Sequence, residues 1–213
     1  MSGILVFSRT TGYRHDSIPA GVRTMRELQG AVEATEDPAA FTPANLARFA
    51  AVVFLNTNGD VLTDTGRRAF EAYVRDGGGF LGVHSAAATE YGWPFYGELV
   101  GAWFDRHPDV QPATVVGADH EHPATAHLPA EWAWTDEWYD FRSRPAARVL
   151  LRVDESTYRG GGMGVSHPLA WCHERFGGRA LYTALGHTTE AYAEPAFRAH
   201  LVGALNWVTR DGG

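Results

Sequence analysis

Apolar runs alternate with polar loops and helix-period segments through the N-terminal half of the chain. Gly3–Phe7 is a short apolar run, and the segment after Ser17 repeats apolar residues at helical spacing. Ala51–Leu55 and Phe80–Val83 are continuous apolar runs, which is typical of strands buried on both faces. Strands that alternate with helices in this way predict right-handed crossovers and a parallel, doubly wound sheet.

Residues typical of helix ends fall between these runs. The expected N-caps are Ser17, Thr42 and either Thr63 or Asp64. The glycine run at residues 77–79 is expected to end the third helix, and a weak strand is expected near Ala31–Thr35. The N-terminal half therefore divides into successive strand–loop–helix units.

The second half of the chain has strand-like segments separated by short turns. These segments are Pro112–Val116, Ala133–Phe141, Arg148–Val153 and Leu169–His173, followed by a central strand at Arg179–Leu185 and a closing helix at Pro195–Val208. This pattern predicts a mixed, partly antiparallel extension of the sheet. Because no repeat or linker interrupts residues 1–213, we expect a single domain.

Ligands of open parallel sheets bind beyond the carboxyl ends of the strands. Polar and titratable side chains in the loops that follow the predicted strands are therefore candidates for a ligand-binding site. They are His15, Asn56, Asn58, His84, Ser85, His187 and Glu190. The sequence predicts that these side chains gather at one edge of the sheet.

His84 stands where a strand must turn sharply into a helix, within Gly82-Val83-His84-Ser85-Ala86. The small neighbours resemble those of a nucleophile elbow. An imidazole there excludes ordinary acyl-enzyme chemistry and offers proton transfer or metal ligation. We expect the N-terminus of the following helix to favour the neutral ring. The alternative is a histidine bonded to the backbone of a tight turn without any chemistry.

Five segments in order along the chain resemble the ThuA-like (trehalose utilisation) family. They are Gly77–Ala86, His122–Thr125, Thr135–Phe141, His167–Trp171 and Gly178–Glu190. The resemblance implies a flavodoxin-like, class I glutamine amidotransferase-like three-layer α/β sandwich. Its central sheet would be mostly parallel, with an antiparallel extension in the second half.

Class I glutamine amidotransferases carry a cysteine at the elbow and a His-x-Glu pair after a late strand. Here the elbow carries His84, and Glu190 follows His187 by three residues, so the location carries over but not the triad roles. Cys172 lies within a predicted strand, far in sequence from the elbow. We therefore expect no glutaminase activity.

The resemblance further implies a role in the utilisation of trehalose or related disaccharides, through 3-keto sugars made by partner oxidoreductases. Our hypothesis is a keto-sugar hydrolase, lyase or isomerase that uses His-based acid/base chemistry. The expected catalytic residues are His84, His187, Glu190 and Glu137. The residues expected to bind the sugar are His15, Asn56, Asn58, Ser85 and Tyr139.

Three alternatives remain open at this point. A divalent metal ion could be bound by His84, His187 and a carboxylate. The chain could instead be a non-catalytic sugar-binding or regulatory module, or a subunit partner of a sugar oxidoreductase. Histidines in other loops and turns, among them His107 and His167, are expected to be structural.

Composition narrows the partners further. The net charge is -7, all 18 basic residues are arginine, and no basic run with interleaved aromatics occurs, so we expect no nucleic acid. No apolar stretch is long enough to span a membrane. A single cysteine and an N-terminus without a signal-peptide pattern favour the cytoplasm. Association into a homo-oligomer stays open.

Overall fold

A nine-stranded sheet organises the computed structural model, which describes residues 3–210. The strands are β1 (Gly3–Phe7), β2 (Val32–Thr35), β3 (Phe49–Leu55), β4 (Gly79–Val83), β6 (Gln111–Gly117), β7 (Glu131–Asp136), β9 (Arg148–Asp154), β10 (His167–His173) and β11 (Ala180–Thr183). Their order is β2-β1-β3-β4-β11-β10-β9-β6-β7. Neighbours from β2 to β11 are parallel and neighbours from β11 to β7 are antiparallel, which confirms the predicted mixed sheet.

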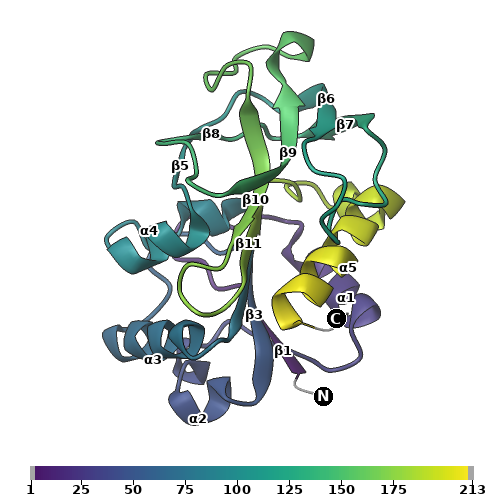
Figure 1. The fold of residues 1–213 in the computed structure, drawn as a ribbon. Coiled ribbons are helices and arrows are strands. Elements are labelled where there is room, and N and C mark those ends of the chain that lie inside the picture. Colours follow the sequence, from purple (N-terminus) through teal and green to yellow (C-terminus); the bar gives the residue numbers. More distant parts are fainter. Residues whose placement is uncertain (1–2, 211–213) are drawn as a thin grey trace.

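Helices cover both faces of the parallel part of the sheet. They are α1 (Ile18–Leu28), α2 (Pro43–Leu46), α3 (Asp64–Arg75), α4 (Pro94–Val100) and α5 (Pro195–Thr209). Helices α1 and α5 lie on one side of the sheet, and α3 and α4 lie on the other (Figure 1). Because β3 and β4 are covered on both faces, nearly all of their side chains are buried. Within residues 3–210, none of the helices has the length and apolar character to cross a membrane.

The predicted helix caps hold at two of three positions. The side chains of Thr42 and Thr63 accept backbone N–H bonds at the starts of α2 and α3. The expectation for Ser17 is wrong, because its side chain makes no capping bond. Its hydroxyl instead bonds the carbonyl of Gly186 and accepts a bond from Asn56. Ser17 therefore ties the start of α1 to two loops at the carboxyl edge of the sheet.

The segment after the elbow is a short 3-10 helix, His84–Ala88, and not the expected α-helix. An α-helix would need the Ala86 carbonyl to accept the N–H of Glu90. That N–H bonds the carbonyl of Gly59 instead, and the Tyr96 hydroxyl takes the Ala86 carbonyl. The α-helix whose N-terminus was expected to act on the His84 ring is therefore absent from this position.

The segment Ala133–Phe141 is also not one strand. β7 ends at Asp136, the chain leaves the sheet for three residues, and a short β8 (Asp140–Phe141) pairs with β5 (Phe104–Arg106) in a separate small sheet. Neither α4 nor β5 is among the predicted elements, because both are too short to carry a clear periodicity. The expected single domain includes residues 1, 2 and 211–213, and the expectation of no signal peptide includes residues 1 and 2. These five residues lie outside the described residues.

A substitution at Gly79 tests how closely α5 packs against β4. A Cβ atom at this position would lie 2.2 Å from the carbonyl oxygen of Val208. We expect Gly79→Ala to lower the free energy of unfolding by about 1–3 kcal/mol, because a backbone atom must move to make room. Gly30→Ala is the matched control, since no heavy atom lies within 4 Å of its added Cβ. Urea unfolding measures both, and equal effects would contradict the close approach.

Candidate active site

His84 ends β4 in a strained conformation that fixes the direction of its ring. Its φ is 49°, in the left-handed region that non-glycine residues rarely adopt. Nδ1 of the buried ring lies 2.7 Å from the carbonyl oxygen of Ala184. Since a carbonyl oxygen only accepts hydrogen bonds, Nδ1 carries a proton, and in the neutral ring Nε2 presents a lone pair. The backbone carbonyl of His84 accepts a bond from the Tyr182 hydroxyl at 2.8 Å.

Three further side chains converge on Nε2 of His84. Nε2 of His15 lies at 3.1 Å and Nδ1 of His187 at 3.3 Å. Oε2 of Glu137 lies 3.4 Å from Nε2 of His84 and 3.3 Å from Nδ1 of His187. The four residues follow β1, β4, β7 and β11 in the chain. The structure thus brings His84 and His187 together, and it adds His15 and Glu137 to them. We call these four side chains the histidine–glutamate cluster.

The surroundings set the charge of the cluster. Burial and the neighbouring rings of His84 and His187 lower the pKa of His15 to about 3. Burial alone would raise the pKa of Glu137, but the His187 and His84 rings beside the carboxylate outweigh burial and hold that pKa well below its ordinary value. Burial lowers the pKa of His187, but the bond to Glu137 reverses the shift, so its net direction is upward. The cluster therefore contains a neutral His15 and an ionised Glu137.

Asp136 holds two of the loops that carry the cluster. Its buried carboxylate accepts four N–H bonds, from the Trp134 indole and from the backbone of Glu137, Gly186 and His187. The distances from donor to acceptor are 2.9, 2.9, 2.9 and 3.2 Å. One side chain thereby fixes Glu137 relative to His187. Sequence reasoning missed Asp136, although it directly precedes Glu137.

A cavity of about 290 Å³ lies in front of the cluster. It is lined by Tyr13, His15, Asn58, Ala88, Phe104, His107, Glu137 and Tyr139. The Tyr139 ring lies 4.3 Å from the rings of both His84 and Phe104, centroid to centroid. The cavity therefore combines an aromatic wall with polar groups, and two members of the cluster form part of its lining.

His107 lines this cavity, and its Nδ1 also donates to the carbonyl of Pro108 at 2.9 Å, as expected of a loop-bonding histidine. Its Nδ1 is 3.2 Å from Oε1 of Glu137, and its ring stacks on that of Tyr139 with an interplanar angle of 25°. The side chain is 37% exposed. His167, in contrast, is fully buried and bonds Glu155 and the carbonyl of Tyr139, in agreement with a structural role.

Glu190 does not join the cluster. The chain turns at Gly186 (φ 109°), and Glu190, which is exposed, then starts the 3-10 helix Glu190–Ala193. Its side chain lines a different hollow together with Thr188 and Glu194. Glu137 occupies the position beside His187 that was expected for Glu190. We therefore remove Glu190 from the candidate catalytic residues.

The residues expected to bind sugar divide into two groups. Asn58, like His15 and Tyr139, lines the cavity, and its Oδ1 accepts the backbone N–H of Tyr13. Asn56 is fully buried and donates to Ser17 and to the carbonyl of Gly186, so it ties loops together and does not face the cavity. Ser85 is also buried, with its Oγ 3.3 Å from Nδ1 of His15.

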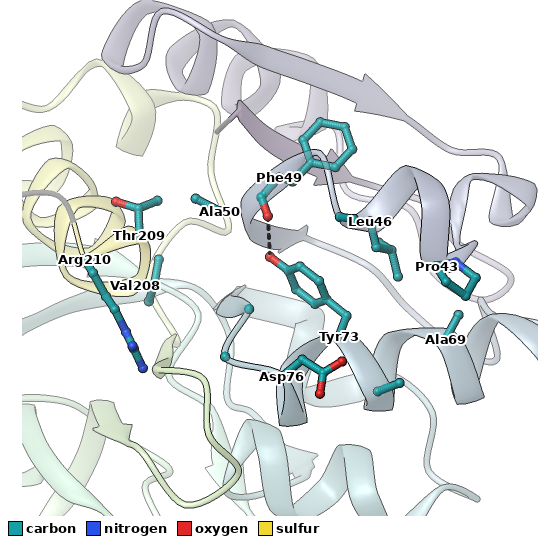
Figure 2. A pocket seen from close by; sticks show the side chains of 14 residues that line it. Pro43, Leu46, Phe49, Ala50, Ala69, Tyr73, Asp76, Val208, Thr209 and Arg210 are labelled. Carbon is teal, nitrogen blue, oxygen red and sulfur yellow. Dashed lines mark hydrogen bonds between the residues drawn. The ribbon is translucent and has the colours of Figure 1, made fainter. Parts of the chain in front are cut away.

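A second hollow of about 380 Å³ lies at the amino-terminal ends of β3 and β4 (Figure 2). Tyr73 crosses it and donates to the carbonyl of Phe49 at 3.3 Å. Most of its lining is alanine, glycine and apolar side chains, with Asp76 and Arg210 as its charged residues. This hollow offers no group of converging titratable side chains, so the cavity at the cluster is the candidate site.

Comparisons with known proteins agree with this fold. A profile of the ThuA family, described as trehalose utilisation, matches residues 3–208. A ThuA-like protein from Bacteroides uniformis ATCC 8492 has a solved structure with TM-score 0.81 and 24% identity, over 97% of this chain and 91% of that one. A ThuA-like protein from Parabacteroides merdae ATCC 43184 has a solved structure with TM-score 0.81 and 21% identity, over 98% of this chain and 90% of that one.

A cytoplasmic protein from Salmonella typhimurium is more distant. Its TM-score is 0.67 at 13% identity, over 97% of this chain and 98% of that one. At identities this low, the likeness to these three structures shows the fold alone. No curated protein sequence matches the chain.

The variant Asp136→Asn tests whether the Asp136 carboxylate holds the segment after β7 against the loop after β11. An amide has one acceptor oxygen, and its NH₂ group would face N–H donors, so buried donors lose their partner. We expect the free energy of unfolding to fall by about 1–3 kcal/mol and hydrogen exchange at Gly186 and His187 to accelerate. Asp37→Asn is the control, because Asp37 is exposed and accepts one backbone bond that an asparagine also accepts. Unchanged hydrogen exchange at Gly186 and His187 in Asp136→Asn would contradict this role of Asp136.

Proposed function

The chain belongs to the ThuA family, and from this membership and its site we propose a carbohydrate-processing enzyme that acts on a keto-disaccharide or a related keto sugar. The family's description as trehalose utilisation supports a role in sugar metabolism. One observation carries the enzymatic part of the proposal: three imidazoles and a carboxylate meet behind a cavity with aromatic walls.

The cavity suits one sugar ring. Its volume of about 290 Å³ is close to the lower end of the range of about 300–1,000 Å³ found for small-molecule pockets. Phe104 and Tyr139 offer apolar ring faces to the C–H surface of a sugar, and Asn58 and His107 offer hydrogen bonds to its hydroxyl groups. A second sugar unit would extend to the cavity mouth, where Tyr13 is 65% exposed.

The chemistry of a keto sugar assigns roles to the residues. Elimination, hydration or isomerisation beside a carbonyl requires a group that moves a proton and a group that stabilises charge on the carbonyl oxygen. Both nitrogens of His84 are engaged, Nδ1 by Ala184 and Nε2 by the cluster, so His84 is not a free base. His107 lines the cavity and lies outside the cluster. In our proposal His107 moves the proton and the cluster stabilises the charge.

Glutaminase chemistry is not part of this proposal. Cys172 lies in β10 and is buried, and burial raises the pKa of its thiol to about 12. A thiol with so high a pKa is a poor nucleophile. We infer that the scaffold is nevertheless amidotransferase-like, because the parallel strand order β2-β1-β3-β4-β11 is the flavodoxin-like order. The Salmonella relative, a cytoplasmic protein, supports the same location for this chain.

Turnover of a 3-keto-disaccharide prepared by oxidation of trehalose tests the function. We expect the purified full chain to consume it, and we expect His84→Ala and His107→Ala each to lower kcat/KM by about 100-fold or more. His127→Ala is the control, because His127 is exposed and outside the cavity lining. Loss of the ketone, followed by nuclear magnetic resonance, measures the rate.

Each outcome separates the proposal from its rivals. Equal turnover in wild type, His84→Ala and His107→Ala would contradict a catalytic site at this cavity. Saturable sugar binding without turnover would favour a sugar-binding module. Neither binding nor turnover, together with stable co-purification of a sugar oxidoreductase, would favour a structural subunit.

A further inference from the structure

We propose that the histidine–glutamate cluster is a binding site for one divalent transition-metal ion, with His15, His84, His187 and Glu137 as its ligands. This site deepens the proposed function by naming a cofactor, and it is testable without any sugar. Each of the four residues offers one ligand atom, and these atoms all lie within 4.8 Å of one another.

The spacing of the four ligand atoms matches a metal site. Zinc–nitrogen bonds of about 2.0–2.1 Å in a tetrahedral site place neighbouring ligand atoms about 3.3–3.4 Å apart. The distances from Nε2 of His84 are 3.1 Å to His15, 3.3 Å to His187 and 3.4 Å to Glu137. Nδ1 of His187 lies 3.3 Å from Oε2 of Glu137. Four of the six distances among the ligand atoms are therefore close to those of a tetrahedral zinc site, and all four atoms lie within 4.8 Å of one another.

The hydrogen bonds of the His84 and His15 rings are compatible with two lone pairs directed into the cluster. Nδ1 of His84 donates to the Ala184 carbonyl, and Nδ1 of His15 has the Ser85 hydroxyl as its partner. In the tautomer in which Nδ1 of His15 donates to the Ser85 hydroxyl, both Nε2 atoms present lone pairs 3.1 Å apart, an arrangement that a cation between them would stabilise. Metal-binding histidines characteristically donate their other ring N–H to a carbonyl, carboxylate or water in this way.

The donor set selects the class of metal. Three imidazole nitrogens and one carboxylate favour zinc and related first-row divalent ions over Mg²⁺ and Ca²⁺, which prefer oxygen ligands. No thiolate takes part, since Cys172 lies within β10. One carboxylate against two positive charges leaves the bound site cationic.

One side of the site is directed at the cavity, because His15 and Glu137 are part of the cavity lining. The keto oxygen of a sugar and the hydroxyl beside it are a chelating pair that a cationic centre would attract. A bound ion would polarise that carbonyl. Nδ1 of His107 contacts Oε1 of Glu137, the oxygen that is not counted among the ligand atoms, and His107 also lines the cavity.

Metal binding to the full chain after treatment with a chelator tests the inference. We expect one equivalent of Zn²⁺ or Co²⁺ to bind by isothermal titration calorimetry, with much weaker binding of Mg²⁺, and we expect Zn²⁺ to raise Tm. His15→Ala and Glu137→Gln should each weaken Zn²⁺ binding by about 100-fold or more, because each removes a ligand. Glu137→Gln keeps the size of the side chain and serves where an alanine variant fails to fold.

Two control variants make the result specific. His127→Ala should bind Zn²⁺ as wild type does, because His127 is exposed and not part of the cluster. His107→Ala should also retain Zn²⁺ binding although it loses turnover. Folded wild-type protein that binds none of these ions, or equal Zn²⁺ affinity in wild type and Glu137→Gln, would overturn the metal site. Sugar turnover that persists in the presence of chelator would overturn the metal's role and leave the proposed function standing.

Discussion

The carboxylate of Asp136 is the interaction on which the candidate site most depends. It is fully buried, and it accepts four N–H bonds that join the end of β7 to the loop after β11. A buried carboxylate is stable only when such donors compensate for its lost hydration. These bonds take the chain out of the sheet at Glu137 and hold it against His187. They act together with the direct contact of 3.3 Å between Nδ1 of His187 and Oε2 of Glu137.

The sheet topology brings together the other two residues of the histidine–glutamate cluster, His15 and His84. β1 and β4 are parallel strands of one sheet separated by β3, so the loops that follow them reach the same edge. Those loops carry His15 and His84. His84 and Asn56 both adopt positive φ where their strands end, a conformation that costs about 1–3 kcal/mol per residue. The packed strands on either side, and the bonds that Asn56 makes to neighbouring loops, offset that cost.

The sequence was sufficient to predict the layers, the mixed sheet and the meeting of His84 with His187, because these follow from the alternation of apolar runs and from strand ends. It was not sufficient where side chains determine the path of the backbone. The segment 133–141 has the composition of one strand, yet the Asp136 carboxylate ends it early. His107 follows a strand of three residues, too short to show periodicity. Glu190 was misplaced because sequence spacing does not reveal the turn at Gly186.

His84 corresponds to the nucleophile of a nucleophile elbow only by its position in the fold. A nucleophile or general base needs one face open to the substrate, and both nitrogens of His84 are engaged within the protein. His107, an imidazole that lines the cavity and lies outside the cluster, comes from a loop in a different part of the chain. In the proposed function the elbow contributes a fixed nitrogen to the cluster, and another residue moves the proton. The strained turn at His84 then serves to fix the direction of a ring and not to expose a nucleophile.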